Sequence, residues 1–199
     1  MVRTRSKDYE NIQASILDNT AALFAERGYA ATSIGDIAQA CDCSKSRLYH
    51  YFENKEDILA EMLSEHIDVL LEGCHDALAK HADPVERFRV LVRFFMGIYA
   101  VSSDKHAVLL TCIRFLPEET RQTVLRKERE LVTFIRDIIA RIRPDIAKNG
   151  QLAHIDTMLF FGMINWTYTW FKADGPVTPE ALADRAVDLF LGGYRELPA

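Results

Sequence analysis

The segment from Ser44 to Phe52 carries side chains suited to binding nucleic acid, at a spacing typical of a short helix. Leu48, Tyr51 and Phe52 lie at i, i+3 and i+4, which predicts an apolar stripe facing a core. The side chains that point elsewhere are polar or basic, and no Asp or Glu occurs between Cys43 and Phe52. Such a helix can donate hydrogen bonds to phosphates and to base edges in a major groove. The residues concerned are Lys45, Ser46, Arg47, Tyr49 and His50.

The residues before this segment predict the rest of a helix-turn-helix. Thr32 or Ser33 can cap a short helix over residues 33–40, whose apolar residues face inward. Residues 41–43 then form a turn of about three residues, the length that joins the two helices of this motif, and Ser44 caps the second helix. The alternative is an ordinary short helix with a solvated polar face. The preceding helix, the turn and the core spacing agree with one another, which favours a DNA-binding unit.

Helical periodicity extends over nearly the whole chain. Gly28 is placed to end a first helix, Pro84 and Pro179 stand at first helical positions, and no alternating run of β-branched residues predicts a strand. We therefore expect an all-α protein of about nine helices. Their expected ranges are 8–27, 33–40, 44–51, 54–80, 84–101, 104–115, 117–142, 150–172 and 178–192.

Three stretches together resemble the DNA-binding signature of TetR/AcrR-type transcriptional regulators. They are Thr32-Ser-Ile-Gly-Asp-Ile-Ala38, Ser44-Lys-Ser-Arg-Leu-Tyr-His-Tyr-Phe52 and Asn54-Lys-Glu-Asp57. Two positions depart from the family pattern. Asp42 stands at the turn position that Gly usually fills, and Asp is one of the few other residues that tolerate a left-handed backbone. Arg47 replaces a small or hydroxyl residue and could bind either a guanine or a phosphate; we favour the base slightly.

The resemblance implies a three-helix DNA-binding domain over residues 1–56 and a helical ligand-binding and dimerisation domain over residues 57–199. It also implies a function: a homodimeric, ligand-responsive transcriptional repressor that binds a palindromic operator. Position by position, it assigns phosphate contacts to Thr32, Lys45, Tyr49 and Lys55. It assigns operator contacts through the recognition helix to Ser44, Ser46, Arg47 and His50.

The C-terminal part is rich in aromatic residues at helical spacing. Most of them must form core, but an aromatic wall with a few polar groups also lines cavities for apolar ligands. The resemblance favours such a pocket, and the segment from Gly162 to Trp170 resembles the subset of the family that responds to acyl-CoA thioesters. Arg89, Arg93 and Arg114 could meet a CoA phosphate, but exposed arginines usually serve only to keep a surface soluble. The candidate ligand-binding residues are Phe95, Tyr99, Met163, Trp166 and Trp170.

The last two predicted helices also suggest a homodimer. The final helix has an apolar stripe whose small members permit close helix packing. The stripe consists of Leu182, Ala186, Leu189, Phe190 and Gly193. Paired with the helix before it, this stripe could form a four-helix interface with a second copy. Packing within one chain is the alternative. A dimer is favoured because a helix-turn-helix binds two half-sites through twofold symmetry.

The sequence gives little support for functional classes other than a DNA-binding regulator. No nucleophile elbow, metalloprotease motif or phosphate-binding loop occurs from residue 57 onward, so we expect neither an enzyme nor a cofactor. Cys41, Cys43, Cys74 and Cys112 include no C-x-x-C pair, and we interpret them as small apolar side chains rather than a metal site. A redox sensor using Cys74 or Cys112 remains an alternative. So does a small-molecule carrier whose N-terminal unit no longer binds DNA.

The formal charge of −5 over 199 residues argues mildly against a nucleic-acid partner. That charge is segregated, however. Residues 1–7 carry +3 and residues 43–55 carry Lys45, Arg47 and Lys55 against Glu53 alone, whereas residues 57–199 carry −4. The longest stretch without a charge, residues 157–171, is shorter than the roughly 20 apolar residues of a membrane helix. Together with the sparse cysteines, this predicts a cytoplasmic protein without a membrane span.

Overall fold

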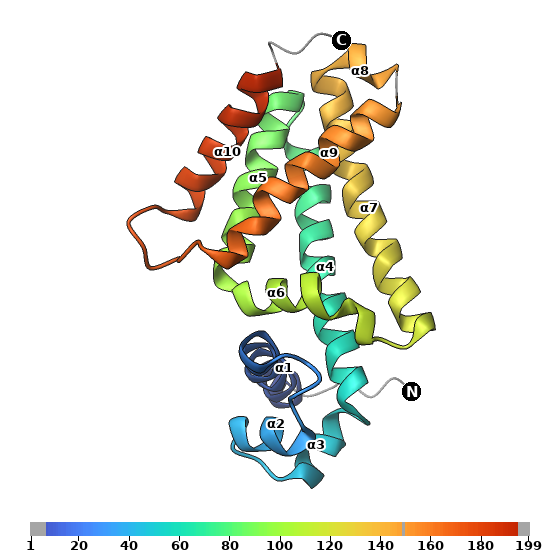
Figure 1. Ribbon diagram of the computed structural model, residues 1–199, viewed down its shortest axis with the longest axis vertical. Helices are drawn as coiled ribbons and strands as arrows, with labels where there is room; N and C mark the ends of the chain where they lie inside the picture. Colours follow the sequence, from blue (N-terminus) through green and yellow to red (C-terminus); the bar gives the residue numbers. More distant parts are fainter. Residues whose placement is uncertain (1–6, 149, 195–199) are drawn as a thin grey trace. The chain divides into compact units, whose positions relative to one another are not determined.

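The computed structural model describes residues 7–148 and 150–194. Every regular element in these ranges is helical, as Figure 1 shows. None of these helices has the length and apolar character that crossing a membrane requires. The α-helices are α1 (Lys7–Arg27), α2 (Ile34–Ala40), α3 (Lys45–Tyr51), α4 (Lys55–Lys80), α5 (Pro84–Val101), α6 (Ser103–Cys112), α7 (Glu118–Ile142), α8 (Pro144–Ala147), α9 (Gly150–Asn165) and α10 (Pro179–Tyr194). Two short 3₁₀ helices follow α6 and α9, namely η1 (Ile113–Phe115) and η2 (Trp166–Thr169).

The predicted all-α fold is confirmed, with three differences in its helices. The helix expected over 104–115 ends at Cys112 and tightens into η1. Pro144 begins a further short helix, α8, that the sequence analysis did not predict. The helix expected over 150–172 ends at Asn165 and tightens into η2. Thr167 donates its hydroxyl to the carbonyl of Ile164 at 2.6 Å, and Thr169 donates to Trp166 at 2.8 Å. These bonds reach carbonyls three residues back and accompany the tighter 3₁₀ turn.

The contacts divide the chain into two compact units. The first comprises the chain up to His66 together with Asp104–Val124, and the second comprises Ile67–Ser103 together with the chain from Leu125 onward. The first unit therefore contains α1, α2 and α3 and also α6 and η1, which come from much later in the sequence. Helices α4 and α7 contribute residues to both units.

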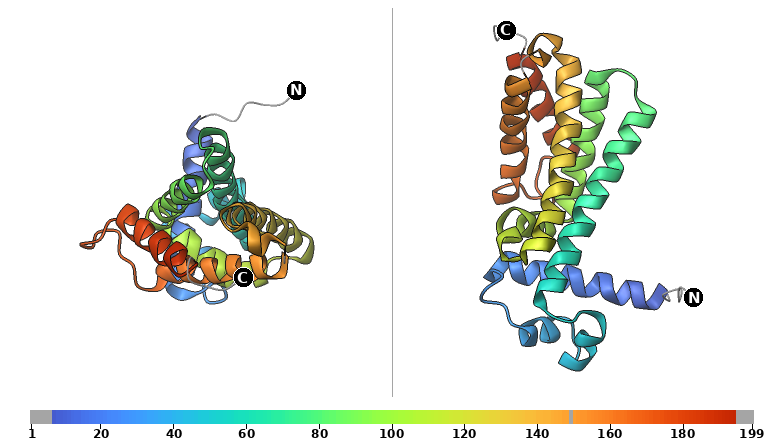
Figure 2. Two further views of the ribbon diagram at one scale, coloured as in Figure 1. Left: turned by 90° about the horizontal axis from the view of Figure 1, so that it is seen from above. Right: turned by 90° about the vertical axis from the view of Figure 1, so that its right-hand side faces the viewer.

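Each unit has its own apolar core. In the first, Leu17, Ile37 and Leu48 are completely buried, one from each of the first three helices. In the second, Phe88 of α5 and Phe160 of α9 are completely buried, with ring centroids 4.8 Å apart. Helix α10 lies alongside α5 in this unit (Figures 1 and 2). Both cores bury their large apolar side chains fully, which provides the main stabilisation of the helices around them.

Candidate nucleic-acid interface

Helix α2 is fixed at its start by a reciprocal capping box. The amide of Asp36 donates to the hydroxyl of Ser33 at 3.2 Å, and the amide of Ser33 donates to the Asp36 carboxylate at 2.8 Å. The Ser33 hydroxyl also donates to this carboxylate, and these bonds from Ser33 hold the pKa of Asp36 below its usual value. Of the two predicted caps, Ser33 is therefore the one that starts the helix.

The turn between α2 and α3 is held by backbone bonds and by one left-handed residue. Asp42 has φ +47°, as its place at the usual glycine position predicts. The amide of Cys43 donates to the carbonyl of Ala38 at 2.9 Å, and that of Asp42 donates to Gln39 at 3.1 Å. These bonds close the end of α2 and set the direction in which the chain enters α3.

Helix α3 begins at the predicted cap and packs on the predicted stripe. The Ser44 hydroxyl accepts a hydrogen bond from the amide of Arg47 at 3.1 Å. Leu48 is completely buried and Phe52 is 4% exposed. Tyr51 is only half-buried, and its ring lies 4.6 Å from that of Tyr9 on α1, so it forms the edge of the stripe rather than its centre. This packing fixes which side of α3 faces solvent.

The polar side chains of α3 are all on the outside. Tyr49 is 53% exposed, and Ser44, Lys45, Ser46, Arg47 and His50 are exposed as well. The side chain of Lys45 lies across Gly35 of α2, since a Cβ added at Gly35 would be 3.2 Å from its Cε. Six of the eight residues predicted to contact DNA thus lie on the surface of one capped helix or at its start.

The other two predicted DNA contacts are engaged inside the unit. Thr32 is 1% exposed and its hydroxyl donates to the carbonyl of Gly28 at 2.9 Å. The ammonium of Lys55 donates to the carbonyls of Tyr29 and Thr32 at 2.9 and 2.8 Å, and it lies 4.1 Å from the centre of the Tyr29 ring. These contacts join the loop after α1 to the start of α4. Thr32 and Lys55 therefore support the site from within, and their phosphate contacts stay a prediction.

Both the N-terminal and the C-terminal part of the chain match known protein families. Residues 16–62 match the family of bacterial regulatory proteins called the tetR family, and residues 81–194 match the tetracyclin repressor-like C-terminal domain. The chain belongs to the TetR family.

Two solved structures and one relative found by sequence are similar to most of the chain. A TetR-family transcriptional regulator from Bordetella parapertussis 12822 is 56% identical, with a TM-score of 0.91 over 96% of this chain and 99% of that one. The regulator AibR, solved with isovaleryl coenzyme A and operator DNA, is 30% identical, with a TM-score of 0.75 over 89% of this chain and 97% of that one. The transcriptional repressor KstR2 of Rhodococcus jostii RHA1 is 28% identical over 91% of this chain and 90% of its own length.

In the second unit of this TetR-family protein, the residues that were predicted to line an effector pocket lie in two different environments. Phe95 is completely buried and Tyr99 is 5% exposed, with its hydroxyl donating to Asn165 at 3.2 Å. Met163, Trp166 and Trp170 are 37%, 63% and 55% exposed. The five side chains therefore do not form one buried wall: two belong to the core and three lie at the surface. Their role in ligand binding stays a prediction.

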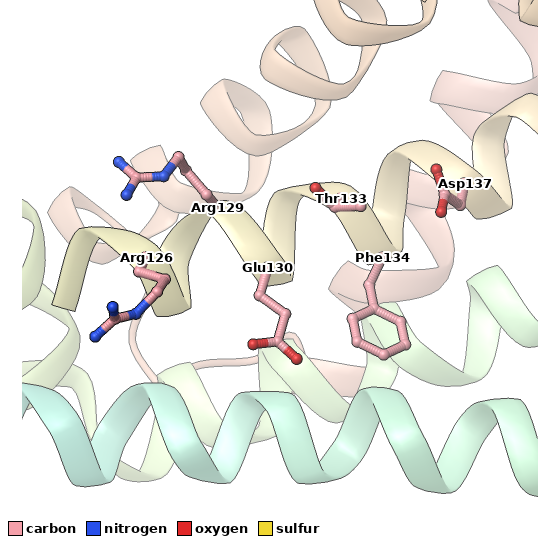
Figure 3. Close-up of a pocket in the computed structure, with 6 residues that line it drawn as sticks. All are labelled: Arg126, Arg129, Glu130, Thr133, Phe134 and Asp137. Atoms are coloured by element: carbon pink, nitrogen blue, oxygen red, sulfur yellow. The ribbon is translucent and has the colours of Figure 1, made fainter. Parts of the chain in front are cut away.

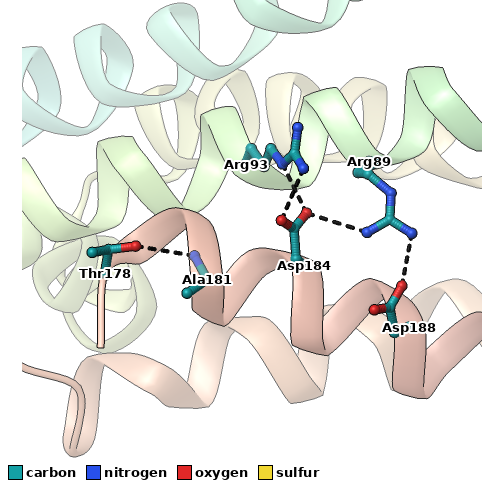
Figure 4. Close-up of polar contacts among 6 residues, drawn as sticks. All are labelled: Arg89, Arg93, Thr178, Ala181, Asp184 and Asp188. Atoms are coloured by element: carbon teal, nitrogen blue, oxygen red, sulfur yellow. Dashed lines mark hydrogen bonds and ion pairs between the residues drawn. The ribbon is translucent and has the colours of Figure 1, made fainter. Parts of the chain in front are cut away.

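Two of the arginines proposed for a CoA phosphate have partners within the chain (Figure 4). Arg93 binds both oxygens of Asp184, at 2.7 and 2.8 Å. Arg89 donates to Asp184 at 3.2 Å and to Asp188 at 2.7 Å, and these arginines lower the pKa of Asp184. Both arginines thus join α5 to α10 through ion pairs, and their contact with a CoA phosphate stays a prediction. The third, Arg114, is exposed, and its guanidinium lies 5.0 Å from the centre of the Phe115 ring.

The second unit also has a groove that the sequence analysis missed. It has a volume of about 490 Å³, and Arg126, Glu130 and Phe134 extend from α7 toward the neighbouring helix α4 in Figure 3. The ring of Phe134 meets His75 of α4 edge-on, with centroids 5.0 Å apart. Along α7 the sequence combines charged and apolar residues at helical spacing. The residues lining the groove are Arg126, Arg129, Glu130, Thr133, Phe134 and Asp137.

Proposed function

We propose that this chain is a homodimeric, cytoplasmic transcriptional repressor that binds a palindromic operator through α3. A hydrophobic or acyl-CoA effector bound by the second unit releases it from the operator. The observation that carries this proposal is the outer face of α3, where exposed polar and basic side chains stand on a helix fixed by Leu48 and Phe52. A helix presented in this way can enter a major groove and contact base edges.

Two kinds of contact are expected from this face. Lys45 is a point charge that suits a phosphate, whereas the planar guanidinium of Arg47 can form two hydrogen bonds to one guanine. Phosphate contacts supply affinity without reading sequence, and base contacts supply the preference for particular bases. Arg47 is therefore the residue on which operator preference depends most in this proposal.

The effector part of the proposal is supported by AibR, whose structure contains both isovaleryl coenzyme A and operator DNA and which is 30% identical to this chain. If the effector favours a form of the protein that binds DNA poorly, operator and effector must weaken each other's binding by the same factor. An acyl-CoA that lowers operator affinity must therefore bind less tightly to the protein–operator complex than to the free protein.

The dimer is proposed to form through α9 and α10. Helix α9 and the η2 turn carry a row of exposed apolar residues at spacings of three and four, and Leu189 of α10 is 55% exposed. Large apolar side chains gathered on one face are typical of a surface that another protein covers. A twofold dimer would place two copies of α3 on half-sites about 34 Å apart, or a multiple of that distance. The exposed residues of α9 and η2 are Leu152, Ile155, Met158, Leu159, Met163 and Trp166.

The proposal is tested by selecting bound duplexes from a random pool and measuring their affinity by fluorescence anisotropy. We expect a palindrome to be enriched, and we expect Arg47→Ala to relax the preference at one base pair in each half-site. A carrier protein that does not read DNA would enrich no palindrome.

Leu159→Glu should convert the dimer to a monomer in analytical ultracentrifugation, whereas Glu53→Lys, a charge change outside α9 and α10, should leave the dimer intact. A Leu159→Glu protein that sediments as a dimer would contradict the proposed interface.

A further inference from the structure

Three aromatic rings meet where the first turn of α1 lies beside the last turn of α3. The ring of His50 lies edge-on to that of Tyr9 on α1, with centroids 6.1 Å apart and an angle of 74° between the ring planes. It also lies edge-on to the ring of Tyr51, the next residue of α3, at 5.5 Å and 86°. The two tyrosine rings are themselves 4.6 Å apart. His50, which is exposed on the outer face of α3, therefore contacts two rings that come from two different helices.

The buried face of α1 fixes the place of Tyr9. Gln13, one turn further along α1, is buried and donates to the carboxylate of Glu61 on α4. Ile16 and Leu17, at the next turn of the same face, are buried as well. Tyr9 itself is half-buried. The start of α1 is thus anchored to the core of the unit, and contacts that do not involve DNA bring the Tyr9 ring to α3.

The orientation of the His50 ring decides what this residue offers to a base. A neutral imidazole has one nitrogen that donates a hydrogen bond and one that accepts, so a half-turn of the ring exchanges the two. The torsion that turns the ring is broad, and an exposed histidine without neighbours samples many orientations. Perpendicular contacts between rings are favourable and restrict this rotation. A ring that is restricted before binding loses less conformational freedom when it meets DNA.

Two roles of Tyr9 predict different results. If Tyr9 only stabilised the packing of α1 on α3, its loss would lower the stability of the unit and would weaken the binding of every DNA sequence alike. If Tyr9 orients His50, its loss changes the preference at the base pair that His50 contacts and leaves the preference at other base pairs unchanged. The perpendicular contact between the two rings favours the second role.

We propose that Tyr9 is a positioning residue for operator recognition, because its ring orients His50 toward one base pair of each half-site. This proposal rests on the proposed function, since it requires His50 to contact the operator. It adds the first turn of α1 to the part of the protein that determines operator preference.

The proposal is tested by anisotropy with the selected operator and with its single-base-pair variants. His50→Ala first identifies the base pair whose preference depends on His50. Tyr9→Ala should relax the preference at that same base pair and weaken binding about two- to tenfold for each half-site, which corresponds to the cost of ordering one side chain. Tyr9→Phe, which keeps the ring, should behave like the wild-type protein. Ile12→Ala shortens another half-buried side chain of α1, is the matched control and should leave this preference unchanged.

A double-mutant cycle separates orientation of His50 from a general loosening of the unit. In a protein that already carries His50→Ala, the further change Tyr9→Ala should not alter the preference at this base pair. Circular dichroism shows whether each variant is folded, and Tyr9→Leu, which keeps much of the side-chain volume, replaces Tyr9→Ala if that variant does not fold.

Three results would overturn the role of Tyr9 while operator binding persists. They are a Tyr9→Ala protein that keeps the wild-type preference, a Tyr9→Phe protein that loses it, and a His50→Ala protein whose preference changes at no base pair. A wild-type protein that enriches no operator would instead overturn the proposed function, and the role of Tyr9 with it.

Discussion

The two units differ in how their candidate residues are arranged. In the first unit, the exposed polar side chains of α3 follow one another within seven residues and are oriented by a local stripe. In the second unit, five candidates from α5, α9 and the turn after it are divided between the core and the surface. A recognition face belongs to a single helix, whereas a ligand pocket depends on how several helices pack. Helical spacing alone therefore predicts the first kind of site better than the second.

The largest effect that tests this comparison concerns two neighbouring residues on α3. Leu48 is completely buried and Tyr49 is 53% exposed. We expect Leu48→Ala to lower the free energy of unfolding by about 2–5 kcal/mol, because it leaves a cavity in the core. Tyr49→Ala should change it by less than about 0.5 kcal/mol and should weaken operator binding instead. Urea denaturation and anisotropy separate the two effects, and an equal loss of stability in both variants would contradict the orientation of α3.

A second effect concerns pH and a buried histidine pair in the first unit. His66 of α4 and His106 of α6 are buried, with Nε2 and Nδ1 3.3 Å apart. Burial, and then the charge of Lys105, lower the pKa of His66 to about 4. The unfolded chain binds a proton on His66 below about pH 6.5, whereas the folded protein does not. The free energy of unfolding should therefore fall by about 3 kcal/mol as the pH drops from 6.5 to 4.

The histidine prediction is checked by urea denaturation at several pH values. His66→Gln should be less stable at neutral pH but should lose much of the dependence on pH in this range. His154→Gln, which replaces an exposed histidine, should keep the wild-type dependence. A wild-type stability that is flat between pH 6.5 and 4 would show that His66 is not held neutral by the fold.

A smaller effect is expected for the ion pairs between α5 and α10. The side chain of Arg89 is 24% exposed and binds Asp184 and Asp188 (Figure 4). We expect Arg89→Ala to lower the free energy of unfolding by about 1 kcal/mol, since solvent screens pairs near the surface. The loss should shrink at high salt. A salt-independent loss would indicate that the packing of the arginine side chain, rather than its charge, joins these helices.

The smallest expected effect tests the position of Lys45. A Cβ at Gly35 would lie 3.2 Å from Cε of Lys45, so Gly35→Ala should displace this side chain without changing any charge. We expect a modest loss of operator affinity. Stability should stay the same or rise by up to about 1 kcal/mol, because alanine favours a helix interior over glycine. A variant with unchanged affinity would show that the position of Lys45 over Gly35 does not limit operator binding.

The features that the sequence predicted correctly depend on residues close together in the chain. Ser33 and Ser44 cap their helices, and Asp42 adopts the left-handed backbone expected of it. Each of these is decided within three or four residues, so the local pattern contains the information. The same holds for the burial of Leu48 and Phe52.

The features that the sequence missed depend on contacts between distant residues. No local pattern shows that the ammonium of Lys55 binds the carbonyls of Tyr29 and Thr32, more than twenty residues earlier, and its phosphate contact stays a prediction. The sequence left open whether Arg89 meets a CoA phosphate or lies in solvent, whereas its partners in the structure are Asp184 and Asp188, almost one hundred residues later. Helical periodicity shows which side of a helix is polar, and it does not show which polar groups another helix supplies.

The central claim, that α3 binds DNA through its exposed face, is tested most directly by the salt dependence of operator binding. Anisotropy over a salt series should give a linear decrease of log affinity with log salt concentration. We predict that Lys45→Ala lowers the magnitude of this slope by about one, because one phosphate contact is lost. Lys148→Ala, which removes an exposed lysine at the end of α8, should leave the slope unchanged. Equal slopes for the wild-type protein and Lys45→Ala would contradict the claim.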